Sequence, residues 1–213
     1  VYNAVDLSVY RDDYAVDEID AVRSKFNIPQ SYMLYLGTIE PRKNLLRLIN
    51  AYAMLRKEEK DVPALVIAGK KGWLYDSIME AVEANGLSDD VIFTGYVSSE
   101  DAPKLMCGAK LFCYPSIYEG YAMPVLEAMA CSVPVLTSNC SSLPEVSRDC
   151  AVNVDPMSEK AICDGMKKLL FDTELCDTLS KKGRALAEQS SWDVQAEKLH
   201  RIYDSLLADQ FNV

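Results

Sequence analysis

The chain has 213 residues, enough for one large domain, and 49% of them are hydrophobic, as in ordinary globular proteins. Acidic residues outnumber basic ones by 32 to 22, so the net charge is −10 and the pI about 4.7. This balance argues against nonspecific binding to nucleic acid and against docking of this chain on an anionic membrane.

Several common signals are missing from the sequence. No apolar run reaches about 18 residues, so no membrane-spanning helix is expected. The chain opens at Val1 without a signal peptide or an initiator Met, which favours a fragment that begins inside a longer protein. Its seven cysteines include no C-x2-C pair and His200 is its single histidine, so neither a zinc site nor a disulfide framework is expected. We therefore expect a cytoplasmic chain without a bound metal or cofactor.

Strand-like and helix-like segments alternate along the chain. Residues 1–30 are polar and irregular, apart from helical spacing between Asp17 and Phe26. The apolar runs that predict strands are 32–37, 63–69, 91–97, 110–114, 133–137 and 151–155. Helices are expected between these strands, including 45–57, 75–85 and one that opens near Ser98, and then at 158–170, 173–188 and 193–209. Asp172 and Ser191 are the expected N-caps of the last two.

This alternation predicts an α/β fold with a doubly wound parallel sheet, Rossmann-like in character, followed by C-terminal helices. The sequence contains neither G-x-G-x-x-G nor G-x-x-x-x-G-K-[ST]. An NAD-binding domain and a P-loop ATPase are therefore not expected.

The stretch from Tyr114 to Ala130 organises the chain. It reads as the end of a buried strand, a loop and the start of a helix. Pro124 suits the first position of that helix, where a missing N–H costs nothing, and Gly120 would allow a ligand to approach the backbone. The free N–H groups of a helix start accept phosphate or other negatively polarised oxygen.

Two carboxylates, Glu119 and Glu127, flank this helix start. One interpretation is that Glu119 is a solvated loop residue and Glu127 complements the helix dipole. The other is that both bind ligand, because the carboxyl end of a central strand is where open α/β sheets hold ligands. A carboxylate can accept two hydroxyl hydrogen bonds, which suits the diols of ribose and sugars.

A pair of cations, Arg42 and Lys43, lies where the first strand leads into its helix. The pair could simply be solvated. Adjacent cations at a helix start oppose the helix dipole, however, at a cost of a few tenths of a kcal/mol. We therefore expect a nearby anion, and a diphosphate would supply one.

The residues E-G-Y-x-x-P-x-x-E-A-M-A, with the strand before them, resemble the E-x7-E motif of the retaining GT-B glycosyltransferases of family 4, also called group 1. By this resemblance Glu127 is the ribose-binding carboxylate. Glu119 faces the transferred sugar and orients it through its hydroxyls, without acting as a nucleophile. The resemblance further implies that the backbone of a short stretch faces the donor sugar: Gly120, Tyr121, Ala122 and Met123.

The resemblance extends along the chain from about residue 30. The segment from Gly37 to Asn44 is similar to the diphosphate-binding turn of the family, and Phe93 to Val97 to its base-binding edge, with Val97 meeting the nucleobase. Many members carry Arg after the first-strand glycine, where this chain has Thr38. Gly37 and Thr38 remain expected donor-binding residues, but the positive charge must then come from Lys43 and Arg42.

The resemblance implies a function and a set of partners. The chain would be the donor-binding half of a glycosyltransferase that moves a sugar from a nucleotide diphosphate sugar to a glycan or lipid-linked acceptor, without a metal. The segments 37–44 and 68–73 look most like mannosyltransferase members, which favours GDP-mannose, with UDP-sugars next. An acceptor-binding N-terminal domain would be the missing partner, so this half alone should be inactive. The parent protein would be peripheral at the cytoplasmic face of the membrane. A non-hydrolysing sugar-nucleotide epimerase half and a noncatalytic nucleotide-sugar-binding module remain alternatives.

The same resemblance divides the chain into three parts. Residues 1–30 form the hinge between domains and a lead-in helix, 31–190 the Rossmann-like domain, and 191–213 a helical tail. The tail carries apolar residues at helical spacing, which could be an ordinary core stripe or part of a strap that crosses to the missing domain. If it is a strap, we expect self-association through the tail or disorder after about Leu207.

Overall fold

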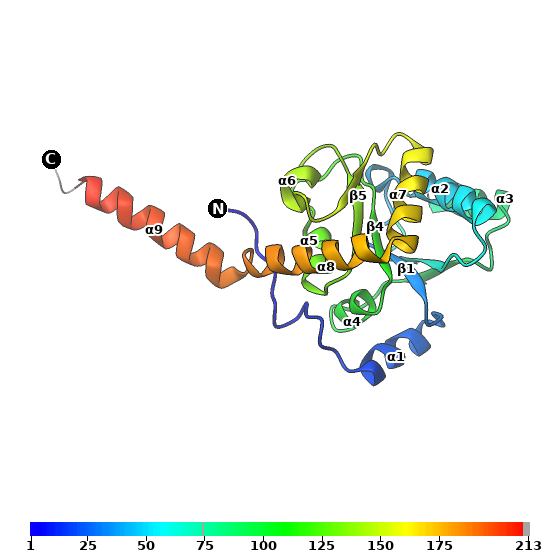
Figure 1. Cartoon of the computed structure of the whole chain (residues 1–213), viewed down its shortest axis with the longest axis horizontal. Coiled ribbons are helices and arrows are strands. Elements are labelled where there is room, and N and C mark those ends of the chain that lie inside the picture. The colour runs from blue at the N-terminus through cyan, green and yellow to red at the C-terminus, as the bar shows by residue number, and fades with distance from the viewer. Residues whose placement is uncertain (74, 211–213) are drawn as a thin grey trace.

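The computed structural model describes residues 1–73 and 75–210. Within these residues the centre of the molecule is a six-stranded parallel sheet (Figure 1). Its strands are β1 Tyr32–Leu36, β2 Ala64–Ala68, β3 Val91–Gly95, β4 Leu111–Tyr114, β5 Val135–Ser138 and β6 Val152–Val154. They lie side by side in the order β3-β2-β1-β4-β5-β6, which confirms the predicted doubly wound fold.

The central strands are almost wholly apolar because helices cover both faces of the sheet. Met33, Leu34, Leu111 and Phe112, for example, are fully buried where β1 pairs with β4. The strands end one or two residues earlier than predicted at several glycines. At Gly69, which follows β2 with φ +154°, an added Cβ would lie 1.9 Å from the carbonyl oxygen of Gly37. The loops after β1 and β2 therefore touch backbone to backbone.

Helices pack on the two faces of this sheet. Contacts between elements place α2, α3 and α7 together, and link α5 to α4, α6 and α8. In the described residues the helices are α1 Val16–Lys25, α2 Leu45–Glu58, α3 Tyr75–Ala84, α4 Ala102–Cys107, α5 Met123–Ala130, α6 Leu143–Ser147, α7 Glu159–Phe171, α8 Thr173–Glu188 and α9 Trp192–Gln210. None of these described helices is long and apolar enough to cross a bilayer.

The predicted caps of the last helices are confirmed. The carboxylate of Asp172 accepts the backbone N–H of Leu175 at 3.0 Å, and the hydroxyl of Ser191 accepts that of Val194 at 3.4 Å. Capping satisfies backbone donors that a helix start leaves free. Local sequence therefore decides where these helices begin.

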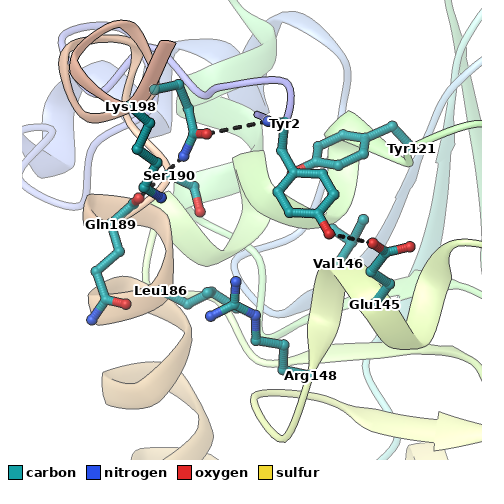
Figure 2. A pocket seen from close by; sticks show the side chains of 10 residues that line it. Tyr2, Tyr121, Glu145, Val146, Arg148, Leu186, Gln189, Ser190 and Lys198 are labelled. Carbon is teal, nitrogen blue, oxygen red and sulfur yellow. Dashed lines mark hydrogen bonds between the residues drawn. The ribbon is translucent and has the colours of Figure 1, made fainter. Parts of the chain in front are cut away.

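The N-terminal segment runs beside the corner between α8 and α9. Val5 is buried, bridges to Ser191, and donates its backbone N–H to the carbonyl of Ser190 at 3.0 Å. The backbone N–H of Tyr2 donates to the side chain of Gln195 at 3.2 Å (Figure 2). The start of the chain is thus tied to the beginning of α9.

Helix α9 extends away from the rest of the domain (Figure 1). Large apolar side chains are exposed along it: Trp192, Leu199, Ile202, Tyr203, Leu206 and Leu207. They do not form a core stripe. The helix also continues to Gln210, so the alternative of disorder from about Leu207 is wrong up to that residue, while residues 211–213 lie outside the described part.

Candidate donor-binding site

The predicted motifs meet where the strand order changes direction. β1 and β4 are neighbours, yet the chain continues from β1 to β2 on one side and from β4 to β5 on the other. The loops that follow β1 and β4 therefore diverge at the carboxyl edge of the sheet, which is the place where open α/β sheets bind ligands. One loop carries Lys43 and the other carries Glu119.

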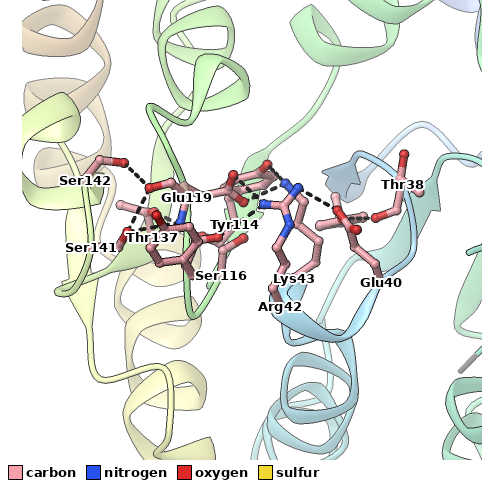
Figure 3. A network of polar contacts seen from close by, with 12 residues as sticks. Thr38, Glu40, Arg42, Lys43, Tyr114, Ser116, Glu119, Thr137, Ser141 and Ser142 are labelled. Atoms are coloured by element: carbon pink, nitrogen blue, oxygen red, sulfur yellow. Dashed lines mark hydrogen bonds and ion pairs between the residues drawn. The ribbon is translucent and has the colours of Figure 1, made fainter. Parts of the chain in front are cut away.

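A buried ion pair joins these two loops (Figure 3). The Lys43 ammonium lies 2.6 Å from one carboxylate oxygen of Glu119, and both side chains are 7% exposed. Lys43 also donates a hydrogen bond to the hydroxyl of Tyr114, the last residue of β4. This contact was not anticipated from sequence. Lys43 is held between a carboxylate and a phenol instead of facing solvent.

Arg42 supports the same carboxylate from the other side. Its guanidinium lies 2.8 Å from the second oxygen of Glu119 and 2.6 Å from Glu40. It also donates to the backbone carbonyl of Tyr118 at 3.2 Å. The fold thus supplies two anions beside the cation pair, Glu119 and Glu40, whereas a bound diphosphate at this place stays a prediction. The cations also lie in a short 3₁₀ turn, Pro41–Lys43, and not in the first turn of α2.

The ion pair controls the charge of both partners. Burial by itself would raise the pKa of Glu119, but hydrogen bonding and attraction from Lys43 outweigh it and hold that pKa below its usual value. Burial lowers the pKa of Lys43, and Glu119 opposes this effect. At neutral pH Glu119 is therefore ionised, and its charge favours the protonated form of Lys43.

Neighbouring polar groups fix the backbone around Glu119. The hydroxyls of Ser141 and Ser142 donate to its carbonyl at 2.8 and 2.9 Å, and its own N–H donates to Ser141 at 3.1 Å (Figure 3). Asn44, which follows the cation pair, is 3% exposed and donates its amide to the carbonyls of Pro115 and Pro156. The two loops are thus held in place from both sides.

The segment between Glu119 and α5 borders open space at Gly120. A Cβ added to Gly120 would meet no atom within 4 Å, so packing inside the chain does not require glycine there. Ala122 has φ +63°, a conformation that costs a non-glycine residue free energy and that concentrates at ligand sites. Helix α5 starts at Met123, so Pro124 occupies its second position and not the predicted first. Met123 itself is half-buried.

A cavity of about 390 Å³ lies at the carboxyl edge of the sheet, and three of the predicted binding residues line it. Gly37, Thr38 and Val97 line it together. Lys70 and Tyr96 form part of the same wall, and the Lys70 ammonium lies 4.8 Å from the ring centroid of Tyr96. The ends of β1 and β3, far apart in sequence, thus share one hollow large enough for a planar base.

The remaining predicted residues have separate surroundings. Tyr121 is half-buried and stacks on Tyr2, with ring centroids 5.8 Å apart. Glu127 begins the second turn of α5, where burial raises its pKa to about 7, partly offset by a hydrogen bond from Tyr10. The structure brings together Arg42, Lys43 and Glu119, but it does not place Glu127 or Tyr121 against them.

Sequence reasoning missed the residues that support the ion pair: Tyr114, Asn44, Ser141 and Ser142. Asn44 carried a usable signal, because Asn tolerates a left-handed backbone and this residue, with φ +62°, directly precedes α2.

Among the described residues, no cluster of three or more His, Cys, Asp or Glu side chains could hold a metal ion.

Comparison with known proteins identifies the family. Residues 17–186 match the family described as "Glycosyl transferases group 1". The chain belongs to this family. One group 1 relative is the O-antigen chain mannosyltransferase B of Escherichia coli, which is 41% identical over 164 residues. That match covers 77% of this chain and 43% of the relative, so the chain spans less than half the length of this curated relative.

Solved structures share the fold. The C-terminal domain of a glycosyl transferase group 1 family protein, LpcC, from Francisella tularensis superposes with a TM-score of 0.75 and 24% identity, over 87% of this chain and 97% of that one. Anabaena Alr3699/HepE, in complex with UDP and glucose, gives a TM-score of 0.81 at 20% identity, over 98% of this chain and 56% of that one. The group 1 chain described here therefore has the Rossmann-like architecture of GT-B glycosyltransferases.

Proposed function

We propose that this chain is the donor-binding half of a retaining glycosyltransferase that transfers a sugar from a nucleotide diphosphate sugar to a glycan or lipid-linked acceptor. The observation that carries the proposal is the pair of ion pairs that Arg42 and Lys43 form with Glu119, at the point where the strand order reverses. The cavity at the same edge of the sheet is lined by Gly37, Thr38 and Val97. These two features would receive the diphosphate and the base of one ligand.

The chemistry rests on charge that develops in the reaction. When the bond between the sugar carbon and the phosphate oxygen breaks, the electron pair stays on the diphosphate. Lys43 and Arg42 would stabilise that new charge. Their hydrogen bonds to Glu119 support this role, because cations held in place in advance act without a cost of reorganisation. Glu119 holds the Lys43 ammonium in place, and its remaining lone pairs can accept sugar hydroxyls.

The favoured donor is GDP-mannose, with a UDP-sugar as the next candidate. The printed names of two relatives support mannose: the O-antigen chain mannosyltransferase B, and the serotype-specific mannosyltransferase WbdA of Escherichia coli, which is 35% identical over 182 residues. The HepE complex with UDP and glucose supports a nucleotide diphosphate donor in this fold and keeps UDP-sugars in the test. The acceptor and its site would belong to the other half of the protein.

Calorimetry on this chain tests the donor assignment. We expect GDP-mannose and GDP to bind, guanosine to bind much more weakly, and UDP-glucose to bind less tightly than GDP-mannose. Tighter binding of UDP-glucose than of GDP-mannose would assign a UDP-sugar as the donor instead. Equal affinity for nucleoside and nucleoside diphosphate would refute the placement of the phosphates at Lys43 and Arg42.

The activity itself is tested on the full-length parent protein. Release of nucleoside diphosphate that depends on an acceptor glycan is expected for a transferase. A change of the sugar within the nucleotide sugar, without release, would indicate an epimerase. Binding without either reaction would indicate a noncatalytic module.

A further inference from the structure

Tyr2 makes three contacts with three different elements. Its backbone N–H donates to Gln195 on α9, its ring stacks on Tyr121 at an interplanar angle of 26°, and its hydroxyl donates to Glu145 on α6 at 2.5 Å (Figure 2). The residue is 48% exposed, so burial does not explain its position. Its ring also borders a cavity of about 110 Å³, and close packing therefore does not lock it from that side.

Two of these contacts lead to the loop that carries Glu119. Tyr121 is separated from Glu119 by Gly120 alone and precedes Ala122, the residue with the strained left-handed backbone. On the other flank, Ser142 binds the carbonyl of Glu119 and directly precedes α6, the helix that carries Glu145. Tyr2 therefore touches the loop itself at Tyr121 and the helix that follows its support Ser142 at Glu145, and it does not line the cavity formed by Gly37, Thr38 and Val97.

The third contact ties Tyr2 to the segments at the edge of the domain. Gln195 is 4% exposed and lies in the first turn of α9, where its side-chain oxygen accepts the Tyr2 N–H. Val5 pairs with Ser190 and Ser191 at the same corner. Any displacement of residues 1–5 or of the start of α9 must therefore move Tyr2.

We propose that Tyr2 is a positioning residue for the donor loop, defined as residues 116–122, and that through Tyr2 this loop responds to the placement of residues 1–5 and of α9. The expected effect of Tyr2 on sugar binding rests on the proposed function, whereas its effect on the loop does not. The aromatic stack resists displacement of Tyr121, and the bond to Glu145 keeps the ring in place. Loss of Tyr2 would loosen the loop on the sugar side of Glu119.

The first test measures amide hydrogen exchange on the unliganded chain, and so does not depend on the donor. Tyr2→Ala should speed exchange of the amides of residues 119–123 by on the order of tenfold, and Tyr2→Phe, which keeps the stack, should do so less. Gln195→Ala, which touches neither Tyr121 nor Glu145, should loosen the same amides. Tyr203→Ala, an exposed tyrosine on α9, is the matched control.

The second test measures binding. Tyr2→Ala should weaken GDP-mannose severalfold more than GDP, because the loop faces the sugar. Unchanged exchange in the donor loop, or equal acceleration in the core strand β4, overturns the positioning role, and an unaffected loop in Gln195→Ala overturns the link to α9. Equal losses for GDP-mannose and GDP overturn the sugar-side assignment. If the wild type binds no nucleotide while its loop still loosens in Tyr2→Ala, the proposed function fails and the role of Tyr2 stands.

Discussion

The pH dependence of folding should reveal the unusual carboxyl of Glu127. Burial of Glu127, which lies on α5, raises the pKa of its carboxyl from 4.5 to about 7, in spite of the hydrogen bond from Tyr10. A raised pKa means that the folded state holds this proton more tightly than the unfolded chain does. Its contribution is therefore fully present below about pH 4.5 and is lost as the pH rises through about 7.

The size of the effect follows from the two pKa values. One pKa unit corresponds to about 1.4 kcal/mol, so ionisation of Glu127 in the folded state costs at most about 3.5 kcal/mol. The side chain is half-buried, and residual solvation reduces this figure. Between pH 5 and pH 8 the free energy of unfolding of the wild type should therefore fall by about 1–3 kcal/mol more than that of Glu127→Gln.

Urea unfolding at several pH values between 5 and 8 measures this difference. The free energy of unfolding of the wild type should fall relative to that of Glu127→Gln as the pH rises. Glu80→Gln, at an exposed position on α3, serves as the control and should follow the wild type. Parallel curves for the wild type and Glu127→Gln would refute the reasoning, as would an NMR titration that places the Glu127 carboxyl at its ordinary pKa.

Four other outcomes follow from the site. Lys43→Ala should weaken nucleoside diphosphate binding by about 1.5–3 kcal/mol in calorimetry and leave nucleoside binding nearly unchanged, whereas equal losses would remove Lys43 from the phosphate site. Gly120→Ala should retain the wild-type midpoint in urea, because its Cβ enters open space, but should lose affinity for the nucleotide sugar. Gly69→Ala, whose Cβ would meet the backbone of Gly37, should unfold at a far lower urea concentration. Normal binding by Gly120→Ala would contradict the assignment of this open space to the sugar. If Glu127 accepts from ribose, Glu127→Gln should discriminate less than the wild type between a nucleotide and its 2′,3′-dideoxy form, and unchanged discrimination would leave Glu127 as a helix residue without that role. Analytical ultracentrifugation should show self-association of the chain that is lost in a version ending at Ser190, since α9 exposes its apolar side chains, and two monomers of equal stability would refute this.

Local sequence patterns determined much of the fold. Apolar runs indicated the strands, the first three of them ending at or beside a glycine, and polar caps such as Asp172 and Ser191 indicated where helices begin. These signals are readable because backbone geometry and helix capping involve residues only a few positions apart. The alternation of strands and helices then restricted the topology to a parallel sheet, and the E-x7-E spacing indicated the loop that faces the ligand edge.

Tertiary structure decided which charges meet. Lys43 and Glu119 are 76 positions apart, and their pairing depends on β1 and β4 lying side by side. From sequence alone the anion expected near Arg42 and Lys43 was a diphosphate, and the two carboxylates that the fold provides were not identified. The partners of a charge are set by strand order and by the paths of two loops, and neither is written in the residues next to it.

The burial and the contacts of individual side chains could not be predicted from the sequence either. From sequence, Glu127 was either a carboxylate that complements the helix dipole or the ribose-binding one, and neither interpretation indicated that burial would raise its pKa to about 7 in spite of a hydrogen bond from Tyr10. Tyr2, in a polar and irregular segment, gave no signal of its contact with Tyr121. Desolvation and stacking are sums over neighbours from distant parts of the chain, and those neighbours exist only once the chain has folded.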